Sequence, residues 1–199
     1  MEASPEVLQV VAALVAGIAL SASCGFRVFV PPLIVSLASL LGFVDLGSSF
    51  AWMGTWQAAV AFGLAALLEI AAYYIPAVDN LLDTVAVPLS AVAGTVLTAS
   101  LFTGDIPPAV QWVLAAVAGG GTAVAVSSGT SAIRGASTVT TAGLGNGLVS
   151  TGELGASVGL SIVTLVLPLL GLVLAVVAVI IAFRVARGVK RRMLGEEQP

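Results

Sequence analysis

The sequence contains no histidine, one cysteine and few charged residues. Without histidine, the chain lacks the commonest metal ligand and the usual general base near neutral pH. A single cysteine, Cys24, excludes an internal disulfide and any metal site built from several thiolates. Only 9% of the 199 residues are charged, against about 25% in soluble domains. We therefore predict no catalytic residue, no metal and no cofactor, and no ordinary water-soluble domain.

Apolar sequence is what the chain has in abundance. Hydrophobic residues make up 59% of it, and the mean hydropathy is +1.13. Several apolar segments approach the length that crosses a bilayer. We predict an all-α, polytopic transmembrane helical bundle of about five or six helices, with broken or re-entrant segments. One transmembrane domain would cover residues 1–185, and residues 186–199 would form a basic-then-acidic cytoplasmic tail.

The basic residues gather at one end of the chain. Five of the seven follow the last apolar segment: Arg184, Arg187, Lys190, Arg191 and Arg192. Basic residues beside a membrane span favour the cytoplasmic side. We therefore predict a protein integral to the cell membrane, with a cytoplasmic C-terminus. Counting spans back from that end places Glu153 on the outer side.

The first apolar segment, Val7–Gly42, is too long for one crossing. As a single helix it would extend roughly 50 Å, more than the ~30 Å hydrocarbon core. We expect breaks at Ser21–Gly25 and Pro31–Pro32, because glycine loosens a helix and proline removes a backbone donor. The pieces are short, which favours a broken or re-entrant helix pair with Arg27 at the break.

The remaining elements follow from apolar length and turn residues. After a loop at 45–55, helices are expected at 56–75, 79–102, 109–126 and 156–183, the third of them interrupted at Gly119–Gly121. Asp79 is expected to cap the N-terminus of its helix. Alternatively, Asp79 and Asp83 share a helical face and could bind a hard cation through oxygen ligands.

The stretch Ser127–Glu153 is unusually polar for so apolar a chain. Ten of its 27 residues are serine or threonine and six are glycine. Irregular backbone persists in lipid only when it is buried in protein or lines a wet cavity, so we interpret this stretch as the lining of a site. The predicted polar lining is Ser127, Ser128, Thr130, Ser131, Thr140 and Thr141. These hydroxyls could coordinate a desolvated ion or bond back to their own helices.

Six ionisable side chains lie within or beside the apolar segments: Arg27, Glu69, Asp79, Asp83, Arg134 and Glu153. Together with Asn146 they form the predicted substrate or ion site. A charge at the bilayer centre costs about 2.5–3.5 kcal/mol, so we expect these groups to converge. If all are ionised, four carboxylates face two guanidiniums, which leaves two negative charges for protons or a cation to balance. Glu69 is the predicted titratable group, and an ion pair with either arginine is the structural alternative.

The segments Ala19–Arg27 and Val126–Arg134 resemble each other. Each has a serine six residues before an arginine, with small residues between. Matching broken helices in two repeats mark the binding site of many transporters. The sequence thus leaves open a two-repeat architecture, with chance similarity among small residues as the alternative.

Four motifs carry a resemblance to a known family: Gly25–Pro31, Glu69 followed by Ile75–Asp83, Thr130–Arg134, and Thr140–Asn146. In these motifs the chain resembles an uncharacterised bacterial family of integral membrane proteins, domain of unknown function 4126. The resemblance covers about Val15 to Val173. It implies no activity, only that the polar positions chosen on physical grounds look like the family pattern.

We predict a small transporter or channel-like protein that moves an ion or small solute through a polar intramembrane site. Its partners would be the lipid bilayer and a second copy in a homodimer, with no nucleic acid. One alternative is a non-transporting membrane scaffold or assembly protein, in which the charges only tie helices together. Another is lipid handling, in which the arginines meet a headgroup phosphate. An enzyme is the least favoured class, because no nucleophile–base pair or phosphate-binding loop stands out.

Overall fold

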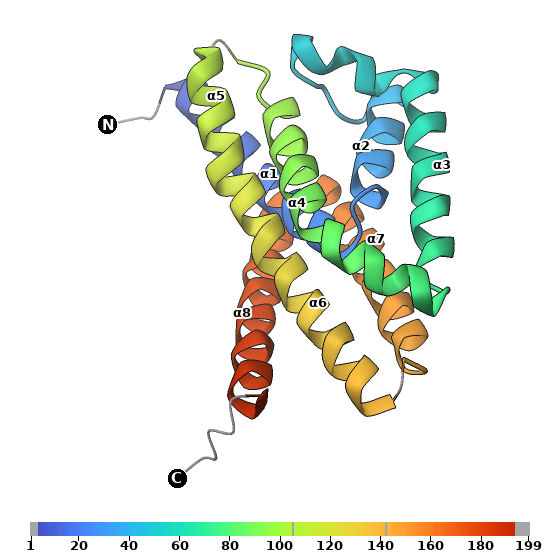
Figure 1. Ribbon diagram of the computed structural model, residues 1–199. Coiled ribbons are helices and arrows are strands. Elements are labelled where there is room, and N and C mark those ends of the chain that lie inside the picture. Colours follow the sequence, from blue (N-terminus) through green and yellow to red (C-terminus); the bar gives the residue numbers. More distant parts are fainter. Residues whose placement is uncertain (1–3, 105, 142, 194–199) are drawn as a thin grey trace.

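The computed structural model describes residues 4–104, 106–141 and 143–193, and the secondary structure in these ranges is entirely helical (Figure 1). The all-α prediction is therefore confirmed. In the described ranges, five helices are long and apolar enough to cross a membrane, or up to six if the pair Ser48–Gly54 and Trp56–Ala72, bent by 66°, counts as one span. The α-helices are α1 (Pro5–Phe26), α2 (Val30–Leu40), α3 (Trp56–Ala72), α4 (Pro76–Ser100), α5 (Pro108–Leu114), α6 (Gly121–Thr141), α7 (Asn146–Val166) and α8 (Pro168–Met193).

The chain breaks between α1 and α2, directly after Phe26. Arg27 has an extended backbone, with φ −143° and ψ 126°, and α2 then carries its two prolines in the first turn. Proline fits there because the first backbone N–H groups of a helix have no intrahelical acceptor. The α1–α2 junction therefore places Arg27 between two helices.

The predicted break at Ser21–Gly25 is wrong, because these residues belong to α1. Their small size serves packing: the Ser21 hydroxyl donates to the Gly94 carbonyl of α4 at 2.8 Å. A Cβ atom added to Gly25 would lie 2.5 Å from the Cβ of Val126 on α6. Small residues let helix backbones approach closely in membrane bundles. The C-terminal half of α1 is thereby held against α4 and α6.

The helix α5 continues into α6 without a break, as the long diagonal rod in Figure 1 shows. The predicted interruption at Gly119–Gly121 corresponds to η2 (Ala115–Gly120), a π-helical segment inside the 34-residue span Pro108–Thr141. The polar stretch is therefore helical on both sides of one turn, where Gly143 has φ 85°. A positive φ suits glycine, which has no Cβ to clash.

The apolar region after the polar stretch forms two helices, so the predicted single helix at 156–183 is wrong. α7 ends at Val166, Leu167 is non-helical with φ −136° and ψ 78°, and Pro168 begins α8. The two helices pack together, since the Thr164 side chain lies against Gly171. This additional span removes the premise that placed Glu153 on the outer side.

Several helices begin or end a few residues away from their predicted boundaries. The predicted loop at 45–55 contains η1 (Ser48–Gly54), a 3-10 helix. The helix predicted at 56–75 ends at Ala72. Ile75, not Asp79, is the N-cap of α4, so the predicted capping role of Asp79 is wrong. The last helix runs to Met193, and residues 194–199 of the predicted tail lie outside the described residues.

α1 forms the centre of the bundle and packs against α4, α6, α7 and α8. Its core positions are small or apolar, including the fully buried Ala19, Leu20 and Ala22. Large apolar side chains such as Leu68 (71% exposed) and Val117 (74%) point outward instead. Such an outward-facing apolar surface suits lipid rather than water.

Candidate functional site

The structure brings together five of the predicted site residues around one tyrosine. We call the group Arg27, Glu69, Tyr73, Asp83, Arg134 and Glu153 the charge cluster. Its members come from the α1–α2 junction and from α3, α4, α6 and α7. Apart from Asp83, whose side chain is 18% exposed, they are all buried. The cost of burying charge in an apolar medium explains why residues so distant in sequence meet.

Arg134 is paired most completely. Its Nε donates to Glu153 Oε1 at 3.1 Å, and its Nη2 lies 2.8 Å from Glu153 Oε2. Its Nη1 lies 2.9 Å from Asp83 Oδ1. The first two contacts form the two-point arrangement that makes arginine–carboxylate pairs strong. Arg134 therefore ties α4 and α7 to α6.

Arg27 is equally buried but is paired less closely. Its Nη2 donates to the carbonyl oxygen of Ser150 at 2.8 Å and also contacts the Ser150 hydroxyl. The same nitrogen lies 3.7 Å from Glu153 Oε2. Its Nε and Nη1 have no hydrogen-bond partner among the described residues. Glu153 is thus the carboxylate that both arginines share.

Tyr73 belongs to the cluster, and the sequence analysis missed it. The guanidinium carbons of Arg27 and Arg134 lie 4.0 and 4.1 Å from the centroid of its ring, which is cation–π distance. A signal was available, because Tyr73 follows Glu69 by four residues and so shares its helical face. Ser150 was also missed. It lies three residues before Glu153 on α7, so it shares the helical face of Glu153 in the same way.

Glu69 bonds to backbone rather than to a basic side chain. Its Oε1 accepts from the Val28 N–H at 2.7 Å, and its Oε2 accepts from the Phe29 N–H at 3.0 Å. In the described part of the chain it forms no ion pair. The carboxylate therefore holds the start of α2, where N–H groups lack intrahelical acceptors and a negative charge is favourable.

Asn146 and the predicted polar lining lie mostly elsewhere. Asn146 begins α7 and donates to the Thr138 hydroxyl at 2.9 Å. Thr130 bonds to the carbonyls of Gly25 and Ser127. Ser127 is buried, Ser131 is half-buried, and Ser128, Thr140 and Thr141 are exposed. The side chain of Asp79 lies outside the described residues.

The helical conformation of the polar stretch has a local cause. The hydroxyls of Thr138, Thr140 and Thr141 donate to carbonyls one turn back in α6, at 3.0, 2.9 and 2.7 Å. Side chains that bond back in this way need no water and no ligand. Of the two roles predicted for these hydroxyls, bonding to their own helix is the one observed at Thr140 and Thr141.

The two similar segments meet in space but differ in conformation. α1 and α6 pack along each other, and both arginines reach Tyr73. Arg27 follows the end of its helix, whereas Arg134 lies inside α6, which continues to Thr141. The two-repeat architecture stays a prediction.

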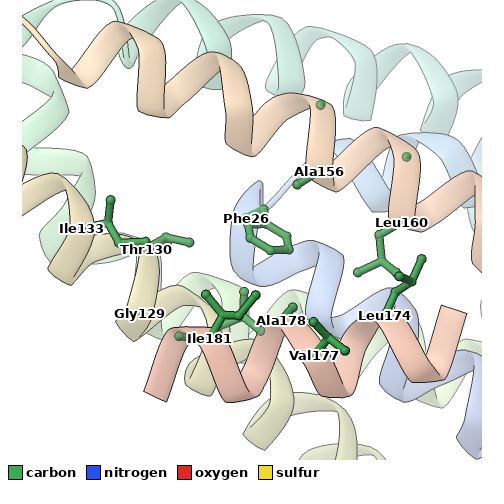
Figure 2. Close-up of a pocket in the computed structure, with 14 residues that line it drawn as sticks. Phe26, Gly129, Thr130, Ile133, Ala156, Leu160, Leu174, Val177, Ala178 and Ile181 are labelled. Carbon is green, nitrogen blue, oxygen red and sulfur yellow. The ribbon is translucent and has the colours of Figure 1, made fainter. Parts of the chain in front are cut away.

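Next to the charge cluster lies an apolar cavity of about 390 Å³. Figure 2 shows Phe26 of α1 projecting between Thr130 and Ile133 of α6, Ala156 of α7 and Ile181 of α8. Phe26 and Arg27 are neighbours in sequence, yet Phe26 faces this apolar space and Arg27 faces the charges. None of the described residues that line the cavity is charged. The described residues also hold no group of His, Cys, Asp and Glu side chains that could bind a metal.

Several long apolar helices with a buried charge cluster define the class: a polytopic helical membrane protein. Within that class, the chain belongs to the family described as Domain of unknown function (DUF4126), whose model matches residues 14–188. The predicted resemblance is therefore confirmed. No curated protein and no solved structure matches the chain.

Proposed function

We propose that the protein moves protons or a small cation across the membrane through the charge cluster. The observation that carries this proposal is the state of Glu69: a buried carboxylate without a basic partner among the described residues. It lies beside a helix break, a feature of transporter binding sites. A carboxylate held by two backbone N–H groups has further lone pairs for a proton or a cation.

The charge balance of the cluster favours a cationic species. Its described members comprise two guanidiniums and three carboxylates. Arg134 is paired with Glu153 and Asp83, and Arg27 lies near the same Glu153. Glu69 is therefore the cluster carboxylate that has no ion pair with either arginine. Uncompensated charge in a membrane interior is costly and marks ion pathways and proton relays. Protonation or cation binding at Glu69 would remove this cost, so the group can alternate between two states.

A second function, a membrane scaffold, is favoured by the complete pairing of Arg134. Three contacts to two carboxylates join three helices, as a purely structural tie would. The third function, lipid handling, requires arginines that reach the bilayer. Arg27 and Arg134 are both 1% exposed, which favours the first two functions over the third.

Orientation and assembly complete the proposal. The exposed Arg184, Arg187 and Arg191 lie near the end of α8, which supports a cytoplasmic C-terminus by the preference of basic residues for that side. A homodimer would supply additional spans around the pathway.

Proton flux into liposomes tests the proposed function. The purified protein is reconstituted with an interior pH dye, and flux is compared for wild type, Glu69→Gln and Asp45→Asn. Asp45 is an exposed carboxylate in the connection after α2, so its variant controls for the loss of one negative charge. We expect flux in wild type and Asp45→Asn, and the level of empty liposomes in Glu69→Gln. Equal flux in all three, or none above empty liposomes from folded wild type with any added cation, would overturn the proposal.

A further inference from the structure

Glu69 also lines a cavity of about 310 Å³ between α3 and α4. Among the described residues, the lining apart from Glu69 and Tyr73 is apolar and includes Leu82, Val85 and Ala86 of α4. Leu68 and Leu89 also line it and are 71% and 42% exposed, so the cavity reaches the outer, lipid-facing surface. Its entrance therefore faces the bilayer, while a buried carboxylate forms part of its wall.

We propose that this cavity binds lipophilic organic cations. The apolar body of the ligand lies among the side chains of α3 and α4, and its cationic group lies against the Glu69 carboxylate. Such molecules concentrate in the bilayer and reach the cavity sideways from lipid. This proposal rests on the proposed function, because the same Glu69 carboxylate would hold either a proton or the cationic group of the ligand.

The charges around the cavity select against other ligands. Each oxygen of Glu69 accepts one backbone hydrogen bond and keeps a further lone pair for a cation. The nearest arginines are engaged by Glu153 and Asp83. An anion would meet a carboxylate of its own sign. A neutral ligand would exclude water and leave that carboxylate without a counter-ion, which is costly in an apolar site.

The larger cavity of Figure 2 provides an internal comparison. Its described lining combines Phe26, Leu160 and Ile181 with small residues, and none of these described residues is charged. Both cavities can take an apolar chain by the hydrophobic effect. Only the cavity beside Glu69 can distinguish a cation from a neutral molecule of the same shape. Preference for charge is therefore the property to measure.

Isothermal titration of the full chain in nanodiscs tests the site with two probes. Hexyltrimethylammonium carries a permanent positive charge, and hexyldimethylamine oxide has a similar size and no net charge. Close charge pairs couple strongly at desolvated sites, so we expect wild type to prefer the cation by at least about tenfold. We expect Glu69→Gln to lose this preference.

A second set of variants keeps the carboxylate, in case Glu69→Gln fails to fold. Ala65→Phe fills the cavity from α3 and should abolish cation binding. Ala61→Phe makes the same change one turn earlier, at an exposed position outside the cavity, and should bind normally. Ala178→Phe, which fills the other cavity, should also bind the cation normally.

Each outcome separates this proposal from the proposed function. Equal affinity of wild type for the two probes, or cation binding that survives in Ala65→Phe, would overturn the cation site. Glu69-dependent proton flux without cation binding would overturn the site and keep proton transport. Cation binding in a protein with no flux of any kind would keep the site and overturn transport.

Discussion

Replacing Glu153 with glutamine removes the one carboxylate that both arginines contact. Glu153 Oε1 accepts from Arg134 Nε at 3.1 Å. Glu153 Oε2 lies 2.8 Å from Arg134 Nη2 and 3.7 Å from Arg27 Nη2. Glu153 is 6% exposed and each arginine 1%, so the guanidiniums would keep their charge without its counter-charge. Removing one partner of a buried pair costs about 3–5 kcal/mol. We expect Glu153→Gln to lower the free energy of unfolding by that amount.

A double-mutant cycle separates the pair from other effects. Arg134→Met alone should cost about as much as Glu153→Gln alone, because each removes the two-point contact between this buried guanidinium and this buried carboxylate. The double variant should lose less than the sum, with a coupling energy of about 1–3 kcal/mol. The assay is reversible unfolding in mixed micelles by titration with sodium dodecyl sulfate, followed by tryptophan fluorescence.

The control is Asp45→Asn, an exposed site that should stay within about 0.5 kcal/mol of wild type. Strictly additive single variants, or a loss below about 1 kcal/mol for Glu153→Gln, would refute the view that this pair stabilises the bundle.

Two further predictions use the same unfolding titration. Tyr73→Leu removes two desolvated cation–π contacts of up to about 2 kcal/mol each. It should therefore lower the free energy of unfolding by about 2–4 kcal/mol, whereas Tyr73→Phe, which keeps a ring, should lower it by less than about 1 kcal/mol. Equal losses in the two variants would contradict the role of the ring. Gly25→Ala should destabilise by about 1–3 kcal/mol, because the added methyl group meets α6. The control is Gly135→Ala, where the added methyl group has open space around it, and it should stabilise α6 by about 0.5–1 kcal/mol. A Gly25→Ala protein as stable as wild type would contradict the close packing of α1 on α6.

The membrane class and the helical architecture were predictable because they depend on local quantities. Apolar length decides whether a segment can span a bilayer, and the excess length of Val7–Gly42 required a break. The position of that break was predicted only in part. Serine, cysteine and glycine at residues 21–25 suggest a weak helix in isolation, but neighbouring helices use their small volume for close packing.

Other features depended on contacts that a single sequence does not display. Proline at position 168 fits both a kink inside a helix and the first turn of a new one, and only the packing of α7 on α8 decides between them. The composition of the polar stretch predicts irregular backbone, yet threonine can satisfy its hydroxyl on its own helix. The role of Tyr73 depends on two arginines, Arg27 and Arg134, that lie 107 residues apart in sequence and reach one ring.

The wide spacing of the cluster along the chain has a consequence for biogenesis. Arg27 and its acceptor Ser150 are 123 residues apart, which at a synthesis rate of about 5–20 residues per second separates them by roughly 6–25 s. Glu69, only 41 residues after Val28, emerges much earlier and can fasten the α1–α2 junction first. Glu69, which stabilises the α1–α2 junction, is therefore synthesised well before Glu153, the carboxylate that lies near Arg27. Until Glu153 is synthesised, the insertion machinery or water must accommodate the charge of Arg27. The last third of the chain therefore completes the charge balance of the α1–α2 junction.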